Sequence, residues 1–289
     1  MAERNGQRGI ALIAVLGFLT VMSVLVIGVV GASRGSINAS ARHLARVQAQ
    51  AAVDSGIDLA IAQLIAVQAV AQPVLREPQE LEVGGFKVMV SARSESAKID
   101  LNFVDVALIT GMFRAVGADD KQAAALAGAV EDWRDADDLL HLNGAEEREY
   151  AAAGLNYGPA NKLFESVNEL QLVLGVSEAM FACLKGDVTV LAQSASVDLD
   201  HASPLVRRAA GVTTETPQGK QQPGYSVISG RTVSPGEVYE ITSTATNEKL
   251  GLRRSQRVVV RITGNSRDPY WTMAVGHATN VNSQCEGSR

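Results

Sequence analysis

Aromatic residues and cysteines are scarce in this chain of 289 residues. Only 4% of the residues are aromatic although 46% are hydrophobic, so the core must be built mainly from aliphatic side chains. Two cysteines, Cys183 and Cys285, exclude a zinc cluster of the usual kind and allow at most one internal disulfide. The sequence leaves a disulfide and two separate thiols equally open.

Basic residues and clustered histidines are also lacking. The chain has 26 lysines and arginines against 31 acidic residues and a net charge of −5, whereas nucleic-acid binding draws most of its affinity from basic surface. The four histidines are dispersed, and no base lies near Cys183 in the sequence, so nucleophilic catalysis has no support. We therefore expect a protein that is not an enzyme and that does not bind nucleic acid.

The longest apolar stretch runs from Ile10 to Ser33 without a charge, directly after Arg8 and Gly9. It exceeds the about 20 apolar residues that cross a bilayer, whereas a secretory signal carries only about 7 to 15 before its cleavage site. We therefore expect a transmembrane segment, and a cleaved signal ending near Ala32 is the alternative. Arginines on both sides of the run leave its orientation open.

No proline occurs before Pro73, and the helical pattern continues beyond the apolar run. Apolar residues recur at steps of three and four, at Ile37, Ala41, Leu44, Val47, Ala51, Ile57, Ile61, Leu64 and Ile65. This spacing predicts one long helix that is apolar all round in its first half and carries an apolar stripe in its second half. That stripe must pack against another element.

Two pairs of β-prone segments lie on either side of a helical region. Residues 81–83 and 86–93 flank a Gly-Gly pair that suits a tight turn. Residues 238–246 and 254–263 flank an Asn-Glu pair and include the most β-prone triplet of the chain, Val-Val-Val. We expect a small antiparallel sheet whose strands come from both sides of the helical region.

The region between these segments, residues 98–191, is alanine-rich and helical in its periodicity. Three polar residues that can begin helices precede periodic segments: Asp119, Ser166 and Ser177. Gln or Glu follows the first two after three residues, as in a capping box. A weak repeat relates residues 99–108 to residues 197–206, because in each a short extended segment leads into a capped helix.

Several segments together resemble one protein family. A basic leader ending at Gly9 and followed by Ile-Ala-Leu-Ile is similar to the class III leader of type IV pilins and type II secretion pseudopilins. The more specific segments are KIDLN at 98–102, DWRDADD at 132–138, NGAEE at 143–147 and FESVNELQLVLGV at 164–176. Together they resemble general secretion pathway protein K, the family of K-type minor pseudopilins of the type II secretion system.

The resemblance implies an α+β fold. A pilin-like long N-terminal spine helix packs on a small antiparallel sheet, and an inserted all-helical domain carries helix-hairpin-helix-like repeats. The expected division is a class III leader peptide at 1–9, a transmembrane part of the spine helix at 10–33, a periplasmic part of it at 34–72, a pilin-like α/β domain at 73–96 and 213–289, and the inserted domain at 97–212.

The resemblance also implies how the protein is processed and what it assembles with. Prepilin peptidase is expected to cleave after Gly9 and to methylate Ile10, leaving a single-pass inner-membrane protein with its globular part in the periplasm. The family caps the pseudopilus tip with I-type and J-type minor pseudopilins, above the major pseudopilin and the inner-membrane assembly platform, and helps initiate assembly for export of folded periplasmic proteins. A minor pilin of a type IV pilus and a single-pass inner-membrane protein with a periplasmic binding domain are the alternatives.

One position favours a cap over a filament subunit. Filament-forming pilins carry a glutamate at the fifth mature residue, where it pairs with the N-terminal amine of a neighbouring subunit. Counted from Ile10, that residue here is Ala14. Because an unpaired carboxylate among apolar helices is costly, a subunit with nothing above it is better without one.

Six carboxylates crowd one short stretch, with only Arg134 and His141 as nearby cations: Asp132, Asp135, Asp137, Asp138, Glu146 and Glu147. Counted from Asp135, Asp137 and Glu146 fall at positions 3 and 12 of a calcium loop, although leucines at positions 5 and 6 exclude an EF-hand. K-type pseudopilins bind Ca²⁺ in this insertion. The resemblance therefore implies five calcium ligands, with Asp132 and carbonyl groups near Leu142 as additions: Asp135, Asp137, Asp138, Glu146 and Glu147.

Other readings of the acidic stretch remain. A solvated acidic loop without a metal is the alternative to calcium. A glycosidase pair has little support, because only Trp133 and Tyr150 lie near enough in the sequence to form a sugar platform. Repeats of the helix-hairpin-helix kind often hold DNA backbones, but the acidic composition argues against that use here.

Overall fold

The computed structural model describes residues 7–68, 78–212 and 236–277. Within helix α1, the side chains of residues 7–11 and 28–38 are not described. The predicted leader peptide therefore lies almost wholly outside the described residues, and the predicted transmembrane segment lies partly outside them. Cys285 is also outside them.

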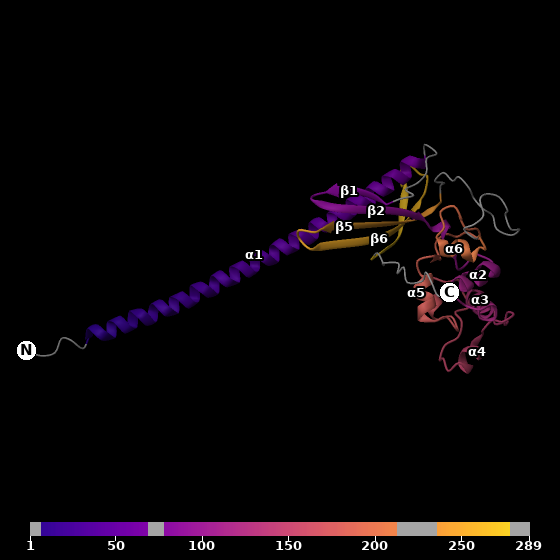
Figure 1. Cartoon of the computed structure of the whole chain (residues 1–289), viewed down its shortest axis with the longest axis horizontal. Helices are drawn as coiled ribbons and strands as arrows, with labels where there is room; N and C mark the ends of the chain where they lie inside the picture. Colours follow the sequence, from indigo (N-terminus) through magenta and orange to yellow (C-terminus); the bar gives the residue numbers. More distant parts are fainter. Residues whose placement is uncertain (1–6, 69–77, 213–235, 278–289) are drawn as a thin grey trace, which may run out of the picture.

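Helix α1, Gln7–Gln68, is the longest element and extends far beyond the rest of the molecule (Figure 1). Its large apolar side chains between Leu12 and Ile27 are exposed, whereas from Ala45 onward one stripe is buried. Among the described residues, no helix is both long and apolar enough to cross a membrane.

Five antiparallel strands form the main sheet in the order β1-β2-β5-β6-β7. The strands are β1 Gln79–Val83, β2 Phe86–Ser94, β5 Val238–Asn247, β6 Leu252–Ile262 and β7 Tyr270–Gly276. The mixed helix-and-sheet class and the antiparallel sheet were both predicted. Gly84 and Gly85 have positive φ angles of 57° and 78°, which explains why glycines occupy the turn between β1 and β2. Strand β7 was not predicted.

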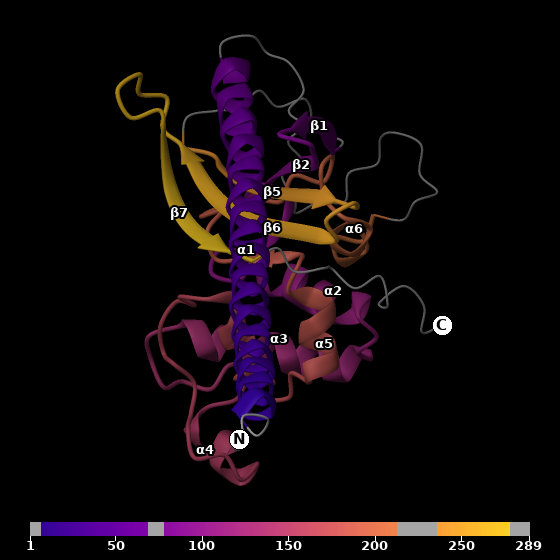
Figure 2. The same ribbon diagram turned by 90° about the vertical axis from the view of Figure 1, so that its left-hand side faces the viewer.

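The second half of α1 lies across one face of this sheet (Figure 2). The interface is an aliphatic core in which Val53, Ile61 and Leu64 of the helix meet Val88 and Ile241 of the sheet. Gly56 sets the distance at the centre, because a Cβ atom there would fall 2.5 Å from Ser243 Oγ and 2.7 Å from a Val90 methyl group. The helix therefore rests directly on the strands.

A helical module with its own core lies at the end of the sheet opposite the N-terminus (Figure 1). Its elements are η1 Glu95–Ala97, β3 Ile99–Asp100, α2 Val106–Ala115, α3 Asp120–Arg134, α4 Glu147–Ala152, η2 Val167–Gln171, α5 Glu178–Leu184, β4 Val188–Thr189 and α6 Pro204–Ala209. The three predicted caps are present, although only Ser166 forms the full reciprocal box and it begins a 3₁₀ turn rather than an α-helix.

The two copies of the weak repeat share local geometry. Asp100 Oδ1 accepts a hydrogen bond from the backbone N–H two residues later, at 2.9 Å, and Asp198 Oδ1 does the same at 3.1 Å. Asp105 then caps α2 and Ser203 caps α6. The copies differ in pairing, because β3 pairs in parallel with β4, whereas Asp198 donates its N–H to the Ser96 carbonyl.

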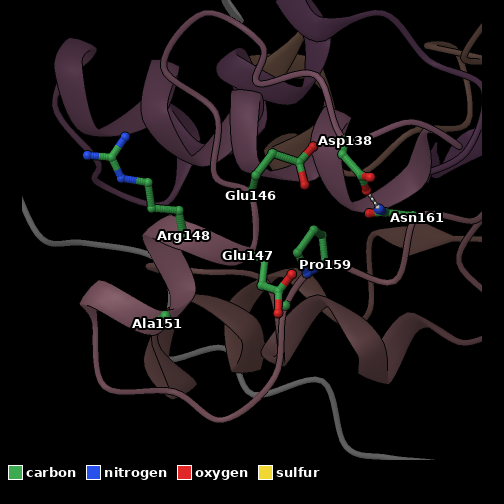
Figure 3. Close-up of a pocket in the computed structure, with 8 residues that line it drawn as sticks. Asp138, Glu146, Glu147, Arg148, Ala151, Pro159 and Asn161 are labelled. Atoms are coloured by element: carbon green, nitrogen blue, oxygen red, sulfur yellow. Dashed lines mark hydrogen bonds between the residues drawn. The ribbon is translucent and has the colours of Figure 1, made fainter.

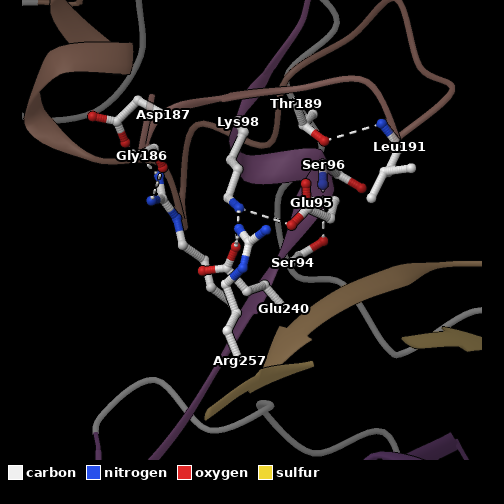
Figure 4. A network of polar contacts seen from close by, with 11 residues as sticks. Ser94, Glu95, Ser96, Lys98, Gly186, Asp187, Thr189, Leu191, Glu240 and Arg257 are labelled. Carbon is white, nitrogen blue, oxygen red and sulfur yellow. Dashed lines mark hydrogen bonds and ion pairs between the residues drawn. The ribbon is translucent and has the colours of Figure 1, made fainter. Parts of the chain in front are cut away.

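Buried charges join the helical module to the sheet (Figure 4). Lys98 Nζ lies 2.7 Å from Glu95 Oε1 and 2.7 Å from Glu240 Oε2, and its side chain is only 4% exposed. Arg257 of β6 also pairs with Glu240. We call these four residues the junction network. A further pair, between Arg93 and the loop after α5, lies beside it.

Candidate metal site

The six clustered carboxylates lie at the end of α3, at the start of α4 and on the loop between them. Asp132 is in the last turn of α3, Asp135 is its C-cap residue, and Glu146 is the N-cap residue of α4. The chain between these caps folds back over α3, where the backbone of residues 143–144 lies within 3 Å of a Cβ placed at Gly128. The absence of a side chain at Gly128 thus allows residues 143–144 to lie against α3.

Two of the aspartates and a histidine form the inner part of the site. The Asp132 side chain is fully buried, and its Oδ1 accepts a hydrogen bond from the His141 N–H at 3.0 Å and lies 2.7 Å from His141 Nδ1. Asp135 Oδ2 lies 3.2 Å from the same Nδ1. Ligand atoms of these three residues lie within 4.8 Å of one another.

The remaining acidic residues line a neighbouring open pocket of about 640 Å³ (Figure 3). Asp138, Glu146 and Glu147 contribute carboxylates, and Asn161 donates its Nδ2 to Asp138 Oδ1 at 2.7 Å. Figure 3 shows Arg148 extending away from these carboxylates. The pocket therefore combines three carboxylates and an amide with apolar surface from Ala151 and Pro159.

Several buried oxygen atoms of the site lack hydrogen-bond partners within the described part of the chain. They are Asp132 Oδ2, both carboxylate oxygens of Asp135, Glu146 Oε1 and Asn161 Oδ1. Buried polar atoms are normally paired, and an unpaired one costs about 1–3 kcal/mol or more when charged. This donor set, all oxygen apart from His141, fits a hard divalent cation.

The basic residue closest in sequence does not neutralise the loop. Arg134 donates from Nη1 to the Leu101 carbonyl at 2.6 Å and from Nη2 to the Val104 carbonyl at 2.8 Å, and it pairs with Glu131. The Arg134 guanidinium thus binds backbone carbonyls at the start of the module and does not contact the acidic loop. Of the described cationic groups, His141 is the one that contacts the aspartates.

The crowding of negative charge changes the proton affinities in the site. Burial, followed by the charges of Asp132 and Asp135, raises the pKa of Glu146 to about 7. Burial and the charge of Asp137 raise the pKa of Asp135. The hydrogen bond with Asp132 raises the pKa of His141. Without a metal, the site therefore binds protons more readily than isolated groups would, and a bound cation would compete with those protons.

The aromatic residues near the loop are packed against one another in the core and do not form a surface on which a sugar could stack. Trp133 stacks on Phe164 with ring centroids 5.9 Å apart, and Tyr150 lies 6.5 Å from Trp133. Trp133 is 3% exposed and Tyr150 is fully buried. Neither ring is free to stack on a carbohydrate, which removes the structural basis of the glycosidase alternative.

The structure places some of the predicted ligand residues close together and leaves others apart. Asp138, Glu146 and Glu147 share the pocket, and Asp135 lies with Asp132. Asp137 is exposed, and its Oδ1 accepts the N–H of Leu139. Sequence reasoning treated Asp132 as secondary although it is the most buried carboxylate of the site.

Asn161 was missed as a site residue. It belongs to the segment after α4 and has a left-handed φ of 48°, a conformation that asparagine tolerates better than most residues. The available signal was an asparagine just after Gly-Pro-Ala, which alone does not indicate a ligand.

Comparison with known proteins finds a family model that matches much of this module. Residues 91–193 match the family model described as Type II secretion system (T2SS), protein K. This part of the chain is thus similar to type II secretion system protein K. It is 27% identical over 206 residues to the type II secretion system protein K of Klebsiella pneumoniae, a match that covers 64% of this chain and 63% of that protein. The matched stretch thus spans less than two thirds of that relative's length.

Two further comparisons show a similar sequence and a similar fold. The protein K of Pseudomonas aeruginosa is 28% identical over 224 residues, covering 69% of this chain and 67% of that protein. The fold is similar to a chain of the crystal structure of the GspK-GspI-GspJ complex from the enterotoxigenic Escherichia coli type 2 secretion system, with a TM-score of 0.60 and 14% identity. That match covers 83% of this chain and 99% of the other.

Proposed function

We propose that this chain is a minor pseudopilin that caps the pseudopilus tip of a type II secretion system and helps initiate assembly for export of folded periplasmic proteins. The observation that carries the proposal is the family match at residues 91–193 together with the fold shared with GspK. One long helix with a bulky module at its far end suits a subunit that assembles through the helix. The chain acts as a structural subunit and not as an enzyme.

The chain is anchored in the inner membrane by residues 10–33, with its globular part in the periplasm. Prepilin peptidase cleaves after Gly9 and methylates Ile10. Exposed apolar side chains between Leu12 and Ile27 support the anchor. The disulfide at Cys183 supports an oxidising compartment. Intact mass of the membrane-extracted protein tests the processing, and a mass that retains residues 1–9 would contradict it.

The finer architecture follows from the same assignment. Helix α1 is the spine that packs against neighbouring subunits, and residues 97–212 are a domain inserted into the pilin-like unit of residues 73–96 and 213–289. The matching turns at Asp100 and Asp198, each followed by a capped helix, support helix-hairpin-helix-like repeats in the insertion.

The partners are I-type and J-type minor pseudopilins at the tip and the major pseudopilin below, with the inner-membrane platform during assembly. The similar GspK chain comes from a complex with GspI and GspJ. Ala14 supports a terminal position, because a buried glutamate there would have no amine to pair with.

Crosslinking along α1 and subunit counting in isolated pseudopili test the cap. We expect about one copy per filament, and crosslinks to other pseudopilins only on the side of α1 facing the filament. Many copies, or a pseudopilin crosslinked beyond Ala14 on the distal side, would exclude a cap. Co-purification with a type IV pilus instead of secretion components would favour the minor pilin alternative.

The acidic loop binds Ca²⁺. The ligands are drawn from Asp135, Asp137, Asp138, Glu146 and Glu147, with Asp132 and Asn161 as additional oxygen donors. Unpaired buried oxygens of Asp132, Asp135 and Glu146 support this assignment, because Ca²⁺ requires six to eight such ligands. When bound, Ca²⁺ supplies the positive charge that holds the loop against α3.

Thermal melting of the full-length protein in detergent tests the calcium site. A ligand that binds only the folded state stabilises it by about 2.7 kcal/mol at a hundredfold excess over Kd, so Ca²⁺ should raise the Tm relative to chelator. The double variant Asp138→Asn, Glu146→Gln should lose that rise. The control Glu248→Gln, Asp268→Asn changes the charge equally on exposed turns of the sheet and should keep it. Equal melting of all samples with calcium and chelator would eliminate the site.

A further inference from the structure

A groove lies between α1 and the beginning of β6. In Figure 1, the turn between β5 and β6 is at the end of the sheet that points back toward the N-terminus. The volume of the groove is about 420 Å³. The lining residues used below are His43, Arg46, Val47, Gln50, Arg253 and Arg254. We call this the basic groove. It lies on the pilin-like part of the molecule, away from the acidic loop.

The charge of the basic groove contrasts with that of the chain. Its lining contains three arginines and a histidine and no carboxylate, although the protein has a net charge of −5. Arg254 donates from Nε to Gln50 Oε1 at 2.8 Å. Arg46 and Arg253 are exposed and have no ion-pair partner within the described ranges. Two guanidinium groups are thus left available for an external anion.

Apolar side chains border these charges. Val47 lines the groove and is 52% exposed, and Leu44, one helical turn earlier on the same face of α1, is 57% exposed. A small anion would leave both side chains in water. A partner surface that combines carboxylates with apolar side chains would cover the whole feature.

We propose that the basic groove docks a carboxylate-bearing amphipathic helix of the neighbouring pseudopilin. The arginines pair with its carboxylates, and Leu44 and Val47 contact its apolar face. This inference rests on the proposed assembly of α1 with other pseudopilin helices and names the surface of the globular part that continues that contact. It also gives a role to Arg253 and Arg254, which form no ion pair with any described residue.

The anionic headgroups of the membrane are a poorer fit than a protein helix. From Ser33, the end of the apolar run, to Arg46 is about 20 Å along a helix that rises 1.5 Å per residue. The headgroup layer extends only about 5 to 8 Å beyond the hydrocarbon core on each side. An arginine side chain does not close that gap unless the helix is strongly tilted, so carboxylates of an adjacent subunit are the nearer anions.

Charge reversal of the groove tests the proposal in the full-length tagged protein, co-expressed with the I-type and J-type minor pseudopilins of the same organism and extracted in detergent. We expect Arg253→Glu, Arg254→Glu to reduce the co-purified pseudopilins about tenfold, because like charges then oppose each other at the interface. The control Lys185→Glu, Arg267→Glu changes the net charge equally at exposed positions elsewhere and should leave the complex intact.

Three further measurements make the result decisive. Arg253→Lys, Arg254→Lys should retain most of the complex, and raised salt should weaken the wild-type complex because exposed charge pairs are screened. Thermal melting should show that both reversal variants remain folded. Lipid phosphorus bound per protein should not change between wild type and variants.

The proposal fails if the reversal variant keeps the complex, if the control loses it equally, or if the reversal removes bound phospholipid while the pseudopilins remain. In each of these results the wild-type complex still forms, so the proposed function stands. If the wild-type chain binds neither minor pseudopilin, the proposed function fails and this inference fails with it.

Discussion

Asp132 organises the acidic loop through contacts on both of its carboxylate oxygens. One oxygen holds the backbone and ring of His141, and the other faces Gly144, where any side chain would overlap it. Replacing Gly144 would thus displace the loop or the buried carboxylate. The conformation of the loop thus depends on two residues, the buried Asp132 and Gly144.

Glu146 gives the metal-free protein a characteristic pH dependence. Its pKa is raised from 4.5 to about 7 in the folded state, so its contribution to stability is present below pH about 4.5 and is lost as the pH rises through about 7. We therefore expect the Tm in chelator to fall between pH about 5 and about 8.

The control for this effect is Glu146→Gln, measured by the same pH series of thermal melts. It should flatten the slope, leaving a smaller one of the same sign from His141, whose folded pKa is also raised. Saturating Ca²⁺ should remove the slope in the wild-type protein, since the cation replaces the protons. A Tm in chelator that rises with pH would contradict this account.

The carboxylates of the site were predictable from the sequence, and their contacts were not. Six acids in one short stretch with little compensating charge are compatible with either a cation site or a solvated acidic loop, and only the family resemblance favoured calcium. The burial of Asp132 depends on the loop folding back over Gly128, and the approach of Asn161 depends on the path of the chain after α4. Both are tertiary effects that local spacing does not encode.

At the scale of elements, the junction network connects two units that otherwise touch little. Burial alone would raise the pKa of Glu240, but the charges and hydrogen bonds of Lys98 and Arg257 outweigh it, so the pKa is lowered. The stability that Glu240 contributes is therefore present above its unfolded pKa and is lost as the pH falls through the folded one. Glu240 therefore keeps its negative charge at neutral pH.

Removal of the central cation tests the importance of this network. Lys98→Met leaves the carboxylates of Glu95 and Glu240 without their shared partner, and breaking a buried pair in this way costs about 3–5 kcal/mol. Lys87→Met removes an exposed pair with Glu80, which is worth about 0–1 kcal/mol. Chemical denaturation compares the two variants, and equal losses would show that the network contributes no more than a surface pair.

The elements most visible in the sequence are those with a strong period or a defined turn. Strands β2, β5 and β6 were predicted with shifts of a few residues, and the turn between β1 and β2 was predicted from its two glycines. Strand β7 was missed, because its exposed residues fall on both faces and give no alternation. The two-residue strands β3 and β4 were below the length that any pattern indicates.

At the scale of the molecule, one covalent link ties α5 to a distant part of the chain. Cys183 is disulfide-bonded, and the sequence contains only one other cysteine, Cys285. Peptide mapping without reduction should therefore yield one linked pair of peptides containing these two residues. Cys183→Ser should leave Cys285 reactive toward alkylating reagents. Alkylation of both cysteines in the unreduced wild-type protein would contradict the bridge.

The order of strands in the sheet has a consequence for synthesis. Strand β2 pairs with β5, so that Lys87 lies opposite Thr246 although the entire helical module separates them in sequence. Contacts between residues so far apart form slowly, and β2 leaves the ribosome long before its partner exists. The helical module, whose contacts are more local, can condense first. If it does so, we expect its collapse to bring the two halves of the sheet together and to shorten the time for which the edge of β2 is open to aggregation.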